Sequence, residues 1–169
     1  MESNPWQAGF ALLARHGLSF DLQCYPLQMP AMATLIARHA EVPAIVNHLG
    51  MPVLADPDGL GEWRTGLRAL AALPNTAIKL SGLGFVARDW TEALVRPLLA
   101  ETIDLFGPAR CLIASGTPTD TLFAPFDRCL GVLAEATAPV SLDERRAMWG
   151  RNADRIYRLE LGTRLDAAT

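Results

Sequence analysis

The sequence predicts an α/β protein built on parallel strands. Short runs rich in apolar or β-branched residues alternate with stretches of helical periodicity, and these runs lie at 18–25, 43–50, 76–83 and 110–116. Enough chain separates successive runs for a crossover helix, which favours parallel strands with right-handed connections. The 169 residues, half of them apolar, are the size of one domain. We therefore expect a single domain, 1–169, with a frayed tail from about residue 162.

The segments beside the first three strand-like runs carry helical signals. The first helix is expected to begin near Pro5 and to end at His16, just before a glycine stop. The next two, 29–40 and 60–73, place their apolar residues at helical spacing on one face. These helices would cover the strands that they connect.

The later helical segments contain residues that predict where helices start or break. Within 90–106, Pro97 predicts a kink or a second helix that starts there, because proline lacks a backbone N–H. Ser141 and Glu144 have the spacing of a capping box at a helix start. Asn152 is expected to cap a final short helix.

The net charge and the cysteine pattern argue against several classes of protein. A net charge of −3 and a pI near 5.6 provide no electrostatic reason to expect nucleic acid or an anionic membrane as a partner. Three cysteines without CxxC spacing suggest buried, reduced thiols, not a disulfide framework or a zinc site. The start of the chain lacks the features of a signal peptide, and no apolar run is long enough to cross a bilayer. We expect a cytoplasmic protein that binds a small molecule.

Polar residues lie near the carboxyl end of each strand-like run, where a parallel sheet buried on both faces would otherwise be apolar. They are Gln23 and Tyr25, Asn47 and His48, Lys79 and Ser81, and Ser115. Ligands of α/β barrels and of doubly wound sheets bind at the carboxyl edge of the strands. The pattern therefore indicates a small-molecule site at that edge.

Two of these residues have competing interpretations. His48 is a candidate general acid or base, because imidazole changes its charge near neutral pH, but it could equally be a core histidine bonded to backbone. Lys79 lies between two apolar residues and needs a carboxylate, a ligand or water, or it could extend to the rim. The sequence contains no HxH, HExxH or Cys/His cluster, so no metal ligand is assigned.

Several stretches, taken in order, resemble motifs of the amidohydrolase-2 family. They are GLSFDLQCYP, VNHLGMPV, LPNTAIKLSGLG, VRPLLAETIDLFGPARCLIASGTPTD and RRAMWGRNADRIYRL. That family comprises TIM-barrel hydrolases, lactonases among them, and some decarboxylases. The resemblance implies that the four strands correspond to the second half of a TIM (β/α)8 barrel. It also implies that the strand with the family's histidine pair is absent from this sequence, as expected for a truncated, C-terminal half.

The resemblance also implies roles for single residues. His48 matches a histidine that polarises the substrate carbonyl or acts as acid or base. Gln23 lies where metal-dependent relatives can place a histidine ligand, which implies the lactonase-like, weakly metal-dependent branch of the family. Full-length relatives can hold a divalent, zinc-like metal. Gly116 stands where the family has an acid after the last strand. The nearest other acid is Asp120, and we expect Asp120 to be a poor substitute for the family's acid.

The site residues expected from these arguments are His48 and Asp120 for catalysis, with substrate binding by Gln23, Tyr25, Lys79 and Ser115. One hypothesis is a hydrolase for a lactone or related cyclic ester of a small organic acid or sugar, impaired in this chain. Another is an inactive half-barrel that binds a small ligand or self-associates through its exposed edges, as a homo-oligomer. A flavodoxin-like sheet that binds a nucleotide would fit the element order, but the chain lacks a phosphate loop.

Overall fold

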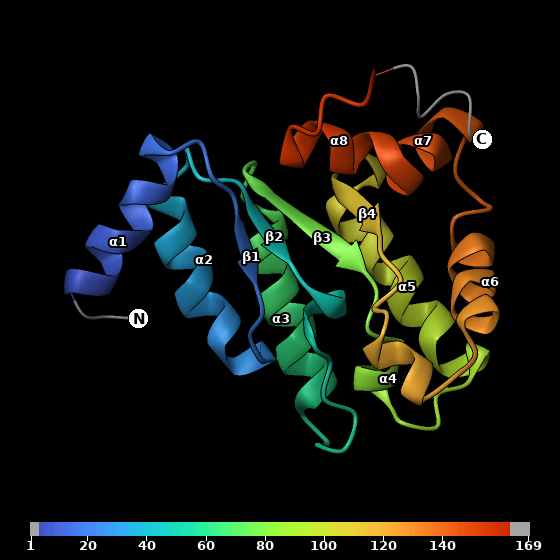
Figure 1. The fold of residues 1–169 in the computed structure, drawn as a ribbon. Helices are drawn as coiled ribbons and strands as arrows, with labels where there is room; N and C mark the ends of the chain where they lie inside the picture. Colours follow the sequence, from blue (N-terminus) through green and yellow to red (C-terminus); the bar gives the residue numbers. More distant parts are fainter. Residues whose placement is uncertain (1–3, 163–169) are drawn as a thin grey trace.

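The computed structural model describes residues 4–162, and its centre is a sheet of parallel strands in the order β1-β2-β3-β4 (Figure 1). The strands are β1 (Phe20–Leu22), β2 (Ala44–Val46), β3 (Thr76–Leu80) and β4 (Cys111–Ile113). Each lies inside one of the four predicted runs but is shorter than that run. The predicted α/β class and the parallel pairing are confirmed.

Helices precede the first strand, connect the strands and follow the last of them. They are α1 (Asn4–Arg15), α2 (Met29–Ala37), α3 (Gly59–Ala71), α4 (Leu83–Val86), α5 (Glu92–Phe106), α6 (Phe126–Ala136), α7 (Leu142–Arg146) and α8 (Asn152–Tyr157). Short turns of 3-10 helix lie at η1 (Pro26–Gln28), η2 (His48–Gly50), η3 (Pro108–Arg110) and η4 (Thr119–Leu122), and a π-helical turn, η5 (Ala147–Arg151), precedes α8. The expected frayed tail lies almost wholly in 163–169, outside the described residues.

The two faces of the sheet are covered differently. Strand residues such as Leu22, Val46 and Ile78 face the helices and are buried in the main core with side chains of α2, α3 and α5. The opposite face, which we call the inner face, carries a smaller apolar cluster of Ile45, Ala77 and Leu112, packed against α8. In Figure 1, α8 lies near the amino ends of the strands and α4 near their carboxyl ends. The inner face is therefore covered at one end and open toward the other.

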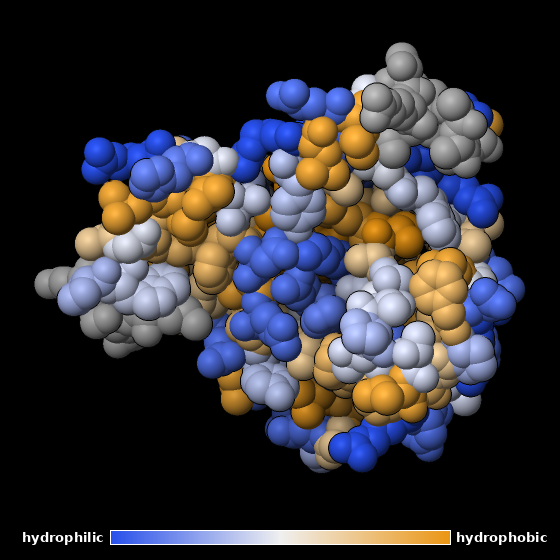
Figure 2. Space-filling view, viewed as in Figure 1, coloured by the Kyte–Doolittle hydropathy of each residue, from blue (hydrophilic) through white to orange (hydrophobic). Residues whose placement is uncertain are grey.

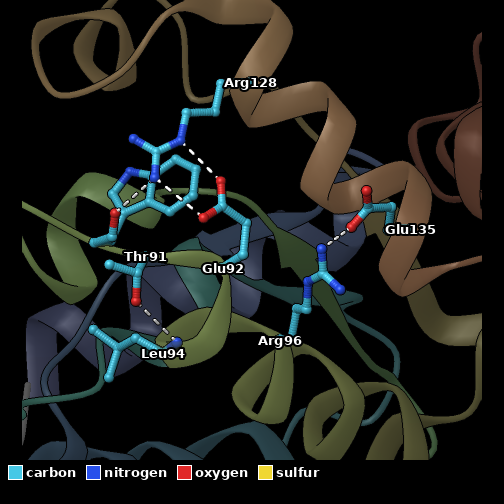
Figure 3. Close-up of polar contacts among 7 residues, drawn as sticks. Thr91, Glu92, Leu94, Arg96, Arg128 and Glu135 are labelled. Carbon is cyan, nitrogen blue, oxygen red and sulfur yellow. Dashed lines mark hydrogen bonds and ion pairs between the residues drawn. The ribbon is translucent and has the colours of Figure 1, made fainter.

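Helix α5 runs without interruption through Pro97, so the second helix expected to start there is wrong. The neighbouring side chains of Val95, Leu98 and Leu99 are buried in the core, and their burial offsets the backbone hydrogen bond that proline cannot make. The helix begins at its N-cap, Thr91, whose side chain accepts the N–H of Leu94 (Figure 3). The tertiary contact surface of α5 thus overrides the local signal of its proline.

Charged side chains join α5 to α6 (Figure 3). Nε of Arg128 lies 2.9 Å from a carboxylate oxygen of Glu92, and its guanidinium carbon lies 4.3 Å from the ring centre of Trp90. Arg96 forms an ion pair with Glu135 of α6. Exposed ion pairs of this kind are screened by solvent and contribute little to stability.

Asn152 does not act as the cap predicted for the last helix. It lies inside α8, and its buried amide nitrogen donates to the carbonyls of Pro108 and Cys111, each at 2.8 Å. The amide therefore fastens α8 to the start of β4. By contrast, the capping box is confirmed, since Ser141 and Glu144 each bond the other's backbone N–H at the start of α7.

The cysteines behave as the sequence predicts. Cys24, Cys111 and Cys129 are all buried and free. Burial raises the pKa of the Cys24 thiol to about 11 and that of Cys111 to about 12, which keeps both protonated at neutral pH. Within 4–162, the helices are too short or too polar to span a bilayer.

Candidate active site

The turns after the four strands meet at the carboxyl edge of the sheet. Because the strands are parallel, the residues that follow them lie at the same edge of the sheet, although β3 and β4 extend two residues further than β1 and β2. Figure 2, viewed as in Figure 1, shows a hydrophilic area in the middle of the molecule with hydrophobic surface on both sides of it. The polar residues predicted from the sequence lie near the carboxyl ends of all four strands.

A hollow of about 400 Å³ lies beside the end of β1. Its lining residues are Gln23, Cys24, Tyr25, Gln28 and Met51. Tyr25 is largely exposed, and its backbone N–H donates to the side chain of Gln28, 2.9 Å away. The two residues expected to orient a substrate after the first strand therefore share one hollow.

His48 lies at the end of β2 in a left-handed backbone conformation, with φ of 53°. Its Nδ1 is 3.0 Å from the hydroxyl oxygen of Ser81, and its ring lies 5.0 Å from the ring of Phe85. Burial lowers the pKa of His48 below its usual 6.5; the Asp120 carboxylate opposes this shift, and the Lys79 ammonium adds to it. The imidazole is therefore neutral at neutral pH and held at a fixed angle.

Next to His48, the side-chain oxygen of Asn47 is buried without a hydrogen-bond partner among the described residues. A buried acceptor without a donor is unfavourable by about 1–3 kcal/mol. A hydroxyl or N–H of a ligand would satisfy it. Our sequence argument noticed Asn47 but assigned it no role.

Lys79 has a partner on the sheet itself. Its ammonium lies 2.6 Å from Oδ2 of Asp21 in β1, and 5.5 Å from the ring centre of Tyr157 in α8. The hydroxyl of Tyr157 donates to the other oxygen of Asp21 at 2.6 Å. Of the partners predicted for Lys79, the structure therefore provides a carboxylate, that of Asp21. A substrate carboxylate would have to compete with Asp21 for the ammonium.

Asp120 folds back to the edge of the sheet. It lies in η4, is 1% exposed, and accepts the backbone N–H groups of Gly82 at 2.9 Å and Gly84 at 3.2 Å. Gly116 leaves the space that this carboxylate fills, because a Cβ there would collide with Oδ2 of Asp120. The hydroxyl of Ser115 accepts the N–H of Thr117 at 3.2 Å, within its own turn. Asp120 and His48 are thereby brought to the same turn, whereas Ser115 bonds locally.

A zinc-like metal does not fit the side chains of this chain alone. Across residues 4–162, no three His, Cys, Asp or Glu side chains form a group that could hold a metal ion. Gln23 provides no imidazole, the Cys24 thiol is protonated, and both oxygens of Asp120 accept backbone N–H groups. We therefore assign no metal ligand and derive no step through a metal.

The profile of the amidohydrolase family (Amidohydro_2) matches residues 2–159, and the chain belongs to this family. It is 40% identical over 154 residues to the uncharacterized protein y4mH of Sinorhizobium fredii, covering 91% of this chain and 52% of that protein. It is 34% identical over 163 residues to an L-fucono-1,5-lactonase of Burkholderia multivorans, covering 89% of this chain and 55% of that enzyme. The chain thus spans about half the length of the curated relatives that it matches.

A crystal structure of an amidohydrolase from Burkholderia multivorans, with bound zinc, has the same fold as this chain. The TM-score is 0.86 at 32% identity, over 93% of this chain and 58% of the other. The family resemblance inferred from the sequence motifs is confirmed, and the four-stranded sheet corresponds to half of the family's barrel.

Asp21 and Tyr157 were missed by the sequence argument. Asp21 lies alone between Phe20 and Leu22, as Lys79 lies alone between Ile78 and Leu80. One acid and one base, each isolated in a buried strand of the same sheet, are a signal for pairing, here across the intervening β2. Tyr157 has no comparable signal, because it lies 136 residues from its partner.

Proposed function

We propose that this chain carries part of the active site of a hydrolase that opens a lactone or a related cyclic ester of a small organic acid or sugar. The observation that carries the proposal is His48, a neutral imidazole held by Ser81 at the carboxyl edge of the sheet. The family membership and the similarity to an L-fucono-1,5-lactonase support the lactone as the substrate class.

The reaction adds water to the lactone carbonyl carbon and then breaks the ring C–O bond. A neutral imidazole suits both steps of this reaction, because it can take a proton from the attacking water and return it to the departing ring oxygen. In the tautomer whose Nδ1–H donates to the Ser81 hydroxyl, Nε2 carries a free lone pair, and we assign the proton transfer to Nε2. Gln23, Tyr25 and the unpartnered oxygen of Asn47 would bind the substrate's hydroxyl groups.

We expect turnover by this chain alone to be weak. A base must lie within hydrogen-bond reach of the water that it activates, and an error of ~1 Å can lower a rate about 10²-fold. Asp120 is buried and already accepts two backbone N–H groups, so it is poorly placed to serve as that base. His48 is left as the main proton-transfer group.

The test combines binding with turnover, using L-fucono-1,5-lactone and its open-chain acid as probes. We expect the imidazole NMR signals of His48 to shift on addition of either probe, and slow lactone hydrolysis that His48→Ala abolishes. His16→Ala, at an exposed histidine, is the matched control. The absence of any shift together with hydrolysis at the buffer rate would refute the proposal. Turnover as fast as that of a full-length relative would refute the weak-turnover expectation.

We also propose that the chain self-associates. β1 and β4 are the edges of the described sheet, and each pairs on one side only. A second copy that places its β1 beside β4 of the first would extend the sheet with parallel strands. Sedimentation velocity over a range of concentrations tests this, and a monomer at every concentration would contradict it.

A further inference from the structure

The carboxylate of Asp120 joins the turns that follow β3 and β4. It comes from η4, after β4, and its two acceptor contacts are to Gly82 and Gly84, directly after β3. Its backbone N–H is anchored in turn by the carbonyl of Gly116 at 3.0 Å. A carboxyl group that is 1% exposed needs such donors, because they replace the water lost on burial.

Two glycines make this approach sterically possible. At Gly116, with φ of +66°, a Cβ would occupy the position of the Asp120 carboxylate. At Gly82, with φ of +72°, a Cβ would lie 2.5 Å from Cβ of His48. Gly82 therefore touches His48 on one side and donates its N–H to Asp120 on the other.

The same turn sets the surroundings of the imidazole. Ser81, one residue before Gly82, contacts Nδ1 of His48, and Phe85 in α4 lies against the ring. Asp120 thus holds the segment that carries both contacts. The charged groups that act on His48 are Asp120 from η4 and Lys79 from β3, with opposite effects.

We propose that Asp120 is a positioning residue, which acts through the Gly82–Gly84 turn to orient His48 and to keep a negative charge beside it. The proposal rests on the hydrolase function proposed above, in which His48 transfers the proton. In this role Asp120 makes no contact with the substrate. It sets the angle and the proton affinity of a group that does.

The primary experiment is an NMR titration of the His48 imidazole in the native chain, Asp120→Asn and Ser81→Ala. Asp120→Asn removes the charge at nearly constant shape, and we expect the pKa of His48 to fall further below its native value. Ser81→Ala is the matched control, because it removes a contact of His48 but no charge. Since this titration uses no lactone, a failure of the proposed hydrolysis would not affect it.

A folded Asp120→Asn protein with the native pKa of His48 would overturn the proposal. A second measurement covers the case in which this variant does not fold. In the native chain, the carboxyl ¹³C signal of Asp120 should change as His48 titrates, because the two charges are coupled. A carboxyl signal that is insensitive to the titration of His48 would also overturn the proposal.

Discussion

The hydroxyl of Tyr157 donates to Oδ1 of Asp21 at 2.6 Å, joining the C-terminal helix α8 to the first strand of the sheet across 136 residues of chain. The second oxygen of the same carboxylate receives the ammonium of Lys79. One acid therefore serves two partners from separate elements. This arrangement closes the amino-terminal part of the inner face, and the open part is left at the carboxyl ends of the strands, where His48 lies.

Tyr157→Phe should lower the free energy of unfolding by about 1 kcal/mol. The substitution keeps the apolar packing of the ring on the inner face and removes one hydrogen bond to a partly exposed carboxylate. Thermal or urea unfolding measures the change. Tyr25→Phe, at the other of the two tyrosines, is the control, and an equal loss there would contradict the assignment.

The ionisation of Tyr157 should be delayed in the folded protein. Burial, followed by the hydrogen bond and the charge of Asp21, raises the pKa of Tyr157 above its usual 10. The folded state thus favours the neutral phenol, and this part of the stability is present below pH 10 and lost as the pH rises through the folded pKa. Ultraviolet titration should show a late tyrosine step that disappears in Tyr157→Phe. A late step that persists in this variant would contradict the prediction.

Acid should destabilise the fold through His48. Its pKa is lowered in the folded state, first by burial, so the unfolded chain binds a proton more readily once the pH falls below 6.5. The free energy of unfolding should therefore decrease below that pH, and less steeply in His48→Gln. Urea unfolding between about pH 7 and 5 checks this, around the ordinary histidine range. A pH dependence in His48→Gln as steep as that of the native chain would contradict the prediction.

Asn152 should contribute strongly to the attachment of α8. Its amide nitrogen donates to two carbonyls at the start of β4, so Asn152→Ala should lower the free energy of unfolding by about 1–3 kcal/mol. Asn152→Asp should lower it further, because a carboxylate cannot donate and would repel both carbonyl oxygens. Chemical unfolding of the two variants measures both values. A milder effect for the aspartate would contradict the geometry.

The sequence predicts much of the fold because its signals are local. The strand runs, the glycine after the first helix and the capping box at Ser141 each depend on neighbouring residues, and the structure confirms them. Pro97 and Asn152 show where local signals fail. The core contacts around α5 outweigh the proline, and Asn152 is committed to carbonyls more than 40 residues away.

The candidate site likewise combines features that local sequence signals predict with contacts that they do not predict. Polar residues after each strand indicate the carboxyl edge, because parallel strands bring their ends together whatever the details of packing. Which of these residues are engaged is not a local property. Ser81 contacts His48, Asp21 holds Lys79, and Asp120 accepts the N–H of Gly82, each over a separation that no periodicity records.

The sequence by itself thus determined the parallel α/β class, the family and the edge of the sheet at which His48 lies. Only the tertiary structure decided the partners of the charged and polar groups there. The physical reason is the separation along the chain over which each kind of interaction acts. Strand and helix signals arise from side chains a few residues apart, whereas a buried carboxylate such as Asp120 is stabilised by whichever distant N–H groups the folded backbone presents.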